Sequence, residues 1–248
     1  AVMSAAYRCC DVVVDLGPCM RERLERYGGS PRRETFTPWA LIEPERPAEP
    51  DPAVRRALFG DAKIGLLYAG SMSRSHDFGS LLELARACRA RAGDEIAMCF
   101  ACTGTNLPVL KAAVRADDTN VRFAPFSAEA TIALRFEAAD FHLGSLRPDF
   151  TGIVVPSKFF AALAVARPFI FAGRADAAIA RWIREFDVGL VLEPGQIDAV
   201  AARLVALKDD GAAIRAGRAR ALTTYRENFS KQLVNDRWAA LLASQLTR

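Results

Sequence analysis

The sequence lacks any long uncharged apolar run. One of the longest, from Phe159 to Ala166, falls far short of the ~20 consecutive apolar residues that a membrane-spanning helix requires. The first residues, Ala1 to Ser4, do not show the charged and apolar regions of a secretory signal peptide. We therefore expect a cytoplasmic protein. Its 248 residues allow one or two domains.

Histidine is scarce, and the cysteines do not form a metal-binding pattern. The sequence contains only two histidines, His76 and His142. Cys99 and Cys102 have the spacing of a zinc or redox pair, but a second ligand pair is missing. The six cysteines lie mostly within apolar patterns, which predicts small buried thiols. We expect no metal ion and no cofactor.

A strong charge imbalance and the common catalytic motifs are also missing. The 33 basic and 29 acidic residues give a net charge of +4, and arginines alternate with acidic residues at 21–23 and 181–185. This pattern indicates a solvated face and not a nucleic-acid-binding surface, so we expect no nucleic-acid partner. No nucleophile elbow, P-loop or zinc-protease motif is present, so no nucleophile stands out.

The sequence does contain a regular alternation of short apolar and longer amphipathic segments beyond Ala62. Several of the short segments are apolar on both faces, as buried parallel strands are. The longer ones carry apolar residues at helical spacing. Strand and helix in this alternation predict an α/β fold with a doubly wound, Rossmann-like parallel sheet. The predicted strands of this sheet are 64–68, 96–100, 121–123, 141–143, 169–171 and 189–192.

Residues 1–40 follow a different pattern. They contain one predicted strand–helix–strand unit, at 11–15, 17–27 and 34–37, with no sheet of its own to join. We interpret 1–40 as the end of another, N-terminal domain. The apolar edge of its first strand is a candidate for pairing with a second copy, which would give a homodimer.

The rest of the chain divides into a linker, a main domain and a last helix. Residues 41–60 are a proline-rich linker followed by a first helix, and 61–228 are the doubly wound domain. Residues 229–248 are a C-terminal helix and a candidate to cross back to the N-terminal part. Trp238 lies on its apolar face, which predicts a core or interdomain contact.

Open parallel sheets bind ligands outside the carboxyl ends of their strands, so the loops after the strands are where a site is expected. In the first loop, Gly70 allows close backbone approach, and Arg74 and His76 supply positive or potentially positive charge. A helix-capping loop is an equally good interpretation of this segment. The candidate residues after the first two strands are Gly70, Ser71, Arg74, His76, Thr103 and Gly104.

The turn after the third strand runs from Ala124 to Phe126, with Ser127 as the predicted N-cap of the next helix. Phe126 is suited to flank a planar base, although a core position is the commoner role of such a residue. Phe126 is therefore a candidate ligand contact.

The loop after the fourth strand is the most informative. Pro156 and Ser157 begin a helix with Ser157 as its predicted N-cap, and the free N–H groups and dipole of a helix start favour an anion. Lys158 opposes the helix dipole, which is easier to explain if an anion shares the site. Arg147 lies on the same loop and is a second candidate for that anion. The turn from Gly152 to Lys158 is thus predicted to bind a diphosphate; two solvent-facing charges are the alternative.

Three segments around these loops, at 68–77, 139–148 and 152–173, resemble a family 4 glycosyltransferase of the GT-B fold, in the branch that builds bacterial surface polysaccharides. The resemblance spans nearly the whole chain beyond residue 60. It implies that 61–228 is the C-terminal, nucleotide-sugar-binding domain and that 1–40 ends the N-terminal acceptor domain. The sequence departs from the family because the usual pair of glutamates is absent, the first position falling near Ile153 and the second at Ala161, and because Ala166 stands where a glycine is usual.

The resemblance implies transfer of a sugar from a nucleotide-sugar, usually UDP-linked, with retained configuration and without a metal. Arg74 and Lys158 are then the catalytic residues, because they would stabilise the departing diphosphate. The resemblance also implies that the turn from Ala124 to Phe126 contacts the base. It also implies a glycan or lipid-linked acceptor, bound through the missing N-terminal domain, and peripheral association of the full-length enzyme with the inner face of the membrane. This fragment alone is expected to bind donor without transferring sugar. A UDP-sugar epimerase of the same fold and a non-catalytic binding remnant stay open as alternatives.

Overall fold

The six predicted strands of the main domain pair into one parallel sheet. The structure is a computed structural model that describes residues 2–29, 31–126 and 129–246. The sheet order is β5-β4-β3-β6-β7-β8, so the strand order reverses between β3 and β6, as in a doubly wound fold. The predicted fold class is confirmed. The strands are β3 Ile64–Ser71, β4 Ile96–Thr103, β5 Val121–Phe123, β6 Phe141–Ser145, β7 Phe169–Ala172 and β8 Gly189–Leu192.

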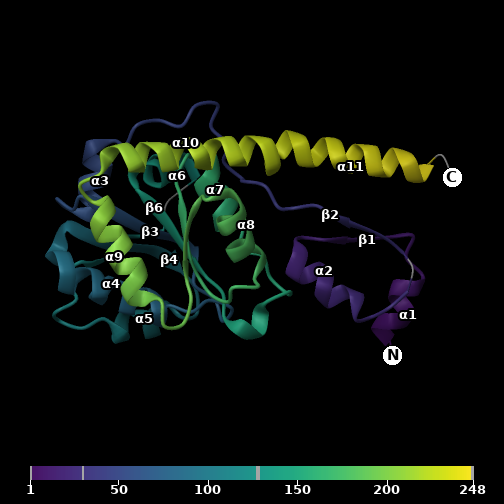
Figure 1. The fold of residues 1–248 in the computed structure, drawn as a ribbon, viewed down its shortest axis with the longest axis horizontal. Coiled ribbons are helices and arrows are strands. Elements are labelled where there is room, and N and C mark those ends of the chain that lie inside the picture. Colours follow the sequence, from purple (N-terminus) through teal and green to yellow (C-terminus); the bar gives the residue numbers. More distant parts are fainter. Residues whose placement is uncertain (1, 30, 127–128, 247–248) are drawn as a thin grey trace.

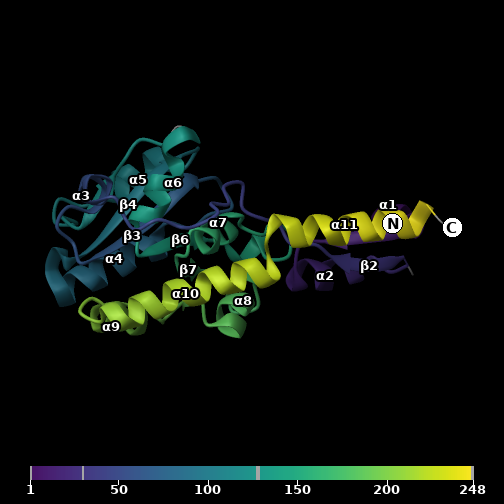
Figure 2. The same cartoon turned by 90° about the horizontal axis from the view of Figure 1, so that it is seen from above.

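Helices cover both faces of this sheet, because its central strands are apolar on both sides (Figures 1 and 2). On one face, α4 and α9 pack over β3, β4 and β6. On the other, α3 and α6 pack over β3 and β4, while α7, α8 and α10 pack beside β7. These helices, with α5 at the edge, are α3 Pro52–Phe59, α4 Gly79–Ala92, α5 Leu107–Ala113, α6 Glu129–Ala138, α7 Lys158–Ala164, α8 Ala178–Phe186, α9 Ile197–Leu207 and α10 Gly211–Asn228.

The N-terminal segment forms a small unit of its own beside this domain. It consists of α1 Val2–Arg8, β1 Val12–Asp15, α2 Pro18–Glu25 and β2 Arg32–Thr35, with β1 and β2 paired in parallel. The buried carboxylate of Asp15 holds the unit together, accepting hydrogen bonds from Thr35 Oγ1 at 2.7 Å and Arg21 Nε at 2.9 Å. The predicted strand–helix–strand is confirmed, and α1 is an addition.

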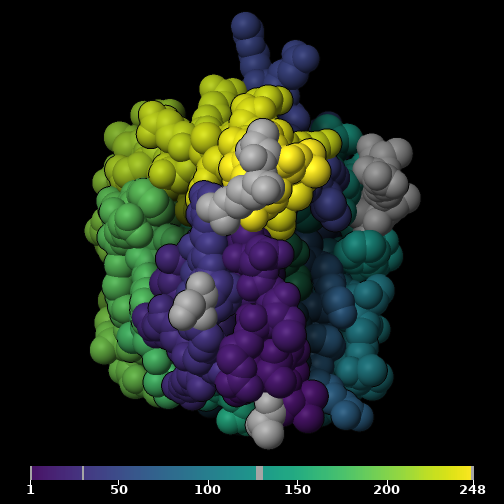
Figure 3. Space-filling view, turned by 90° about the vertical axis from the view of Figure 1, so that its right-hand side faces the viewer, coloured from purple at the N-terminus to yellow at the C-terminus, as the bar shows by residue number. Residues whose placement is uncertain are grey.

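The last helix, α11 Lys231–Leu246, extends α10 away from the sheet and lies over this N-terminal unit (Figures 1 to 3). The ring of Trp238 packs edge-on against Phe36 with centroids 4.5 Å apart, and Arg237 donates to the carbonyl oxygen of Thr35 at 2.9 Å. The predicted contact of Trp238 is therefore confirmed, and it joins the C-terminal helix to the residues that follow β2.

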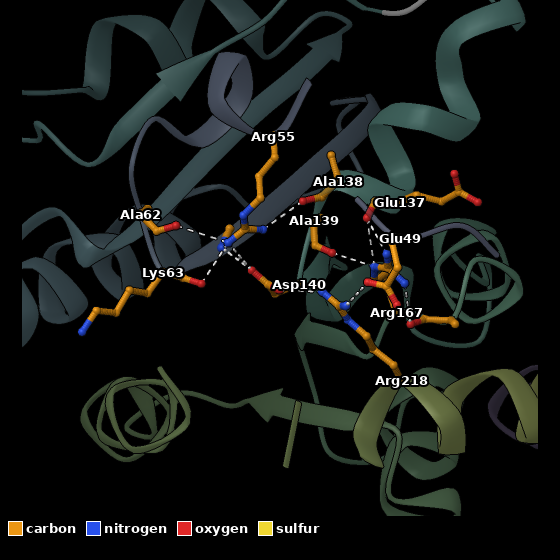
Figure 4. A network of polar contacts seen from close by, with 12 residues as sticks. Glu49, Arg55, Ala62, Lys63, Glu137, Ala138, Ala139, Asp140, Arg167 and Arg218 are labelled. Atoms are coloured by element: carbon orange, nitrogen blue, oxygen red, sulfur yellow. Dashed lines mark hydrogen bonds and ion pairs between the residues drawn. The ribbon is translucent and has the colours of Figure 1, made fainter. Parts of the chain in front are cut away.

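A buried polar network fixes the linker and α10 to the start of β6 (Figure 4). Asp140 pairs with Arg55 and Arg218 at 2.8 Å each and accepts the backbone N–H of Gly65 at 2.9 Å. The buried guanidinium of Arg167 donates to backbone carbonyls, among them that of Ala139 at 2.7 Å. Because Asp140 and the two guanidinium groups of Arg167 and Arg218 bond to the linker, the sheet and α10, the network connects these three parts, although Nε of Arg218 has no hydrogen-bond partner among the described residues.

Some details differ from the sequence-based expectations. Cys19, Cys88, Cys99 and Cys102 are buried as predicted, but the prediction is wrong for the first two cysteines. Those two, at positions 9 and 10, are exposed because they follow α1, in which no residue is buried. Ser127, the predicted N-cap of α6, lies outside the described residues.

Candidate functional site

The candidate site lies at the carboxyl ends of β3 and β6, where the strand order reverses. At this point the loops after the two neighbouring strands lead to helices on opposite faces of the sheet, which leaves room for a ligand between them. Gly70 and Ser71 end β3, Ser145 ends β6, and Lys158 begins α7. Residues far apart in the sequence therefore meet at one edge.

Lys158 is the central cation of this edge. Its Nζ donates to the carbonyl oxygen of Ser71 at 3.2 Å and lies 5.1 Å from the ring centre of Tyr68. Within the described residues it pairs with no carboxylate. Burial lowers the pKa of Lys158 to about 8, a shift that the nearby Cys102 thiol opposes. The protein thus holds a partly desolvated ammonium group that an anion would stabilise.

Because Gly70 has no side chain, it leaves the space that the side chain of Lys158 occupies. Its φ is +113°, and a Cβ on Gly70 would lie 3.0 Å from Cε of Lys158. A side chain here would therefore both strain the backbone and push against the lysine. The group that comes close to the backbone of Gly70 is therefore the side chain of Lys158.

His76 is buried under the same loop. Its Nδ1 lies 2.7 Å from the carbonyl oxygen of Ser145, which can only accept, so Nδ1 carries the proton. Burial and then the charge of Lys158 lower the pKa of His76 below its usual 6.5, although the bond to Ser145 opposes this. The imidazole is therefore neutral at pH 7 and offers Nε2 as a hydrogen-bond acceptor. It supplies no positive charge there, in contrast to what its position in the sequence indicated.

Arg74 and Arg147 carry the exposed positive charges of this edge. Both side chains are exposed, and neither makes a hydrogen bond or ion pair with another described residue. Their loops are joined, because the N–H of Arg147 donates to the carbonyl oxygen of Ser75 at 2.8 Å. The structure thus brings the two predicted cationic loops together.

The same loop also caps a helix. The Asp77 carboxylate accepts the N–H of Gly79 at 2.9 Å, at the start of α4. The N–H of Asp77 donates to the side chain of Ser145 at 3.1 Å. Capping and a ligand-facing role are therefore compatible interpretations of this segment, since different residues serve each.

Thr103 and Gly104 support the loop after β3. The N–H of Met72 donates to the carbonyl oxygen of Thr103 at 2.7 Å, and a Cβ on Gly104, at φ +113°, would lie 2.7 Å from the carbonyl oxygen of Met72. Thr103 and Gly104 are exposed, as is Ser71, which pairs with Thr103 in the sheet. The end of β4 thus forms one side of the candidate site.

The turn after β5 lies at one side of this edge. Ala124 donates its N–H to the carbonyl oxygen of Phe100 at 3.1 Å, and Phe126 is 48% exposed. Phe126 lines a small hollow together with Ala69 and Ala101, which lie near the ends of β3 and β4. An exposed aromatic ring next to the strand ends is placed to stack on a planar group.

The predicted helix start is present, but its residues do not all lie near Lys158. Ser157 occupies the N-cap position of α7 and is exposed, although its side chain makes no capping hydrogen bond. Pro156, just before it, is buried. Gly152 lies apart from Lys158: its φ is +77°, and a Cβ there would lie 2.7 Å from the carbonyl oxygen of Cys19. Gly152 therefore contacts α2, not the residues around Lys158.

Sequence reasoning missed three residues of this edge. Tyr68 places its ring beneath Lys158, Cys102 lies close enough to influence the lysine, and Ser145 binds both His76 and Asp77. Each ends or nearly ends a predicted strand, so the rule that ligands bind at strand ends is the one signal that points to them.

The described residues contain neither a metal-binding cluster nor a membrane-spanning helix. Within residues 2–29, 31–126 and 129–246, no three histidine, cysteine, aspartate or glutamate residues gather in a way that would hold a metal ion. Among the described helices, none has both the length and the apolar character required to cross a membrane.

The fold resembles that of solved glycosyltransferase structures. A TarM variant from S. aureus, in complex with Fondaparinux, alpha-GlcNAc-glycerol and UDP, has a TM-score of 0.74 at 12% identity over 97% of this chain and 45% of that one. HepE from Anabaena, in complex with UDP and glucose, has a TM-score of 0.75 at 15% identity over 98% of this chain and 66% of that one. This chain therefore spans about half to two thirds of the length of these proteins.

A shorter structure matches about three quarters of this chain. The C-terminal domain of LpcC, a Glycosyl Transferase Group 1 family protein from Francisella tularensis, has a TM-score of 0.56 at 17% identity over 74% of this chain and 96% of that one. No protein-family model and no curated protein matches the sequence. At these identities the likeness shows the fold: the chain has the fold of GT-B glycosyltransferases.

Proposed function

We propose that the chain is the donor-binding half of a retaining, metal-independent glycosyltransferase of family 4, acting on a UDP-linked sugar. The observation that carries the proposal is the partly desolvated Lys158 ammonium at the strand-order reversal, which pairs with no carboxylate of the described residues. The UDP present in the TarM and HepE structures supports the choice of nucleotide.

The residues of this edge fit the needs of sugar transfer. When the bond from the sugar C1 to the diphosphate oxygen breaks and C1 bonds to an acceptor hydroxyl, the hydroxyl proton is released and negative charge grows on the diphosphate. Lys158 and Arg74 would stabilise that charge, with Arg147 beside them. Because these cations supply the compensating charge, we expect no requirement for a metal.

The other candidate residues would hold the donor in place. Gly70, Ser71 and Ser157 border the place expected for the diphosphate, and Thr103 and Gly104 form its wall. Phe126, next to Ala124, would stack on the uracil base. The neutral imidazole of His76 would accept a hydrogen bond from a sugar hydroxyl.

The partners of the whole enzyme are part of the same proposal. A glycan or lipid-linked acceptor, a cytoplasmic location at the membrane face and polysaccharide synthesis follow from the family resemblance. The strands β1 and β2 pair only with each other among the described residues, and their outer edges support association with more protein, either the rest of an N-terminal domain or a second copy.

Titration calorimetry on the full chain tests the proposal. We expect UDP to bind and uridine, which lacks the diphosphate, to bind much more weakly or not at all. Absence of UDP binding at millimolar concentration would contradict the proposal. Incubation with a UDP-sugar and no acceptor is expected to leave the sugar unchanged, whereas its conversion into an epimer would favour the epimerase.

A further inference from the structure

One face of α2 turns charged side chains toward the doubly wound domain. Glu22 and Arg23 lie three and four residues after Cys19, and Arg26, the C-cap, lies four and three residues after them, so the four share one side of the helix. Cys19 is buried there, and its Sγ accepts the N–H of Ala178, the first residue of α8, at 3.3 Å. The positions that usually carry apolar residues in a packed helix carry charge in α2 beyond Cys19.

These four residues line a cavity between α2 and two loops of the main domain. The cavity measures about 180 Å³, and we name it the α2 cavity. At ~30 Å³ per water molecule this is room for roughly six waters, or for one phosphate or carboxylate group with some of its hydration. The main domain contributes Pro148, Thr151, Arg174 and Asp176.

The α2 cavity lies at the same edge of the sheet as Lys158. Its loops follow β6 and β7, whereas Lys158 and Ser71 lie where β3 adjoins β6. Gly152 permits this arrangement, because it lacks the Cβ that would lie 2.7 Å from the carbonyl oxygen of Cys19. The loop that leads from Arg147 to Lys158 therefore borders the candidate donor site and also the α2 cavity.

The charges around the α2 cavity do not balance. Glu22 pairs with Arg181, and Asp176 with Arg174, at 2.7 Å in each case. The side chains of Arg23 and Arg26 make no hydrogen bond or ion pair with another described residue. Two positive charges are thus left uncompensated.

A hydroxyl group adds to these unused donors. Oγ1 of Thr151 is buried and has no hydrogen-bond partner among the described residues. A buried polar group without a partner is costly, so it favours a ligand or water that can bond to it. Guanidinium groups and a hydroxyl are the donors that bind phosphate and carboxylate oxygens.

We propose that the α2 cavity binds a negatively charged group of the acceptor, a phosphate or a carboxylate. The inference rests on the proposed function, since it places the acceptor beside the donor. It assigns the acceptor to the anionic class, and it assigns Arg23 and Arg26 to its recognition.

Calorimetry on the full chain with saturating UDP tests this inference. UDP occupies the donor site, and glycerol 1-phosphate and glucuronate then serve as separate phosphate and carboxylate probes. The double variant Arg23→Gln/Arg26→Gln is compared with Arg203→Gln/Arg215→Gln, a control pair that removes the same charge from exposed arginines of α9 and α10. We expect at least one probe to bind, and the α2 pair to weaken its binding about tenfold, as expected for lost charge-assisted hydrogen bonds.

The outcomes separate this inference from the proposed function. The probe that binds more tightly identifies the phosphate or the carboxylate as the group recognised. Equal binding by the α2 pair and the control pair, or failure of both probes to bind to the UDP-saturated chain, would overturn the inference. UDP binding is measured independently in every variant, so its absence would count against the proposed function alone.

Discussion

The Nζ atom of Lys158, at the start of α7, lies 3.2 Å from the carbonyl oxygen of Ser71, at the end of β3. This contact spans the reversal of strand order, and Lys158 has no carboxylate partner among the described residues. A carbonyl oxygen offers only a partial negative charge, so it compensates the ammonium incompletely. The relationship explains both the lowered pKa of Lys158 and the expected affinity of this edge for a diphosphate.

The pH dependence of UDP binding follows from that pKa. Lys158 has a pKa of about 8 in the free protein, and a bound diphosphate raises it. Below pH 8 the lysine is protonated in both states, so its contribution to UDP affinity is constant. Above pH 8 only the complex keeps the proton, so affinity falls by up to about tenfold per pH unit.

Calorimetry from pH 7 to pH 9.5 measures this fall. The Lys158→Arg variant stays charged over the whole range, so its affinity is expected to change little. A flat profile for the unmodified chain would show that the charge of Lys158 does not contribute to binding.

Gly70→Ala tests the contact between Gly70 and the lysine. The new Cβ would lie 3.0 Å from Cε of Lys158, so the flexible side chain has to move, and UDP affinity is expected to fall several-fold. Backbone strain at φ +113° adds a loss of about 1 kcal/mol in the free energy of unfolding. Gly195→Ala is the control, since it has φ +82° with no atom within 4 Å and should keep UDP affinity. Unchanged affinity in Gly70→Ala would contradict the assigned position of Lys158.

Ala166→Gly is expected to stabilise the fold. Ala166 has φ +58°, a conformation that costs an alanine roughly 1 kcal/mol and a glycine almost nothing. Denaturant unfolding should therefore show a gain of about 1 kcal/mol. Ala164→Gly, inside α7, should instead lose about 1 kcal/mol because glycine is a poor helix former. Equal losses in the two variants would disprove the strain at Ala166.

Gly189→Ala tests the pairing of the edge strand β8. A Cβ at Gly189 would overlap the carbonyl oxygen of Phe169, so β7 and β8 cannot stay in register. We expect a loss of more than about 3 kcal/mol in the free energy of unfolding. Gly93→Ala, at φ +57° with no atom within 4 Å, should lose only about 1 kcal/mol. Similar losses in both would mean that the register of β8 is loose.

The sequence was sufficient to predict the sheet and the edge that carries the site. Apolar segments such as 64–68 and 169–171 are buried on both faces in the structure, so the run of apolar residues was enough to predict buried strands. The loops with Arg74 and Lys158 were identified because ligands bind at strand ends, a rule that needs only strand positions.

Other features depend on contacts between distant segments, which no local pattern reveals. Lys158 lies against the ring of Tyr68 because Gly70 leaves space, and Gly152 faces Cys19 because α2 packs beside it. The neutrality of His76 follows from burial under Ser145, 69 positions further along the chain. The helix α1 was not predicted because none of its residues is buried, so no apolar face marks it.

The most direct test of the account is UDP binding by the full chain at pH 7 with Lys158 and with Lys158→Ala. The account predicts that UDP binds to the unmodified chain and that Lys158→Ala weakens this binding at least about tenfold, while Lys158→Arg retains most of it. Equal UDP affinity in the unmodified chain and in Lys158→Ala would contradict the central claim that Lys158 binds the diphosphate.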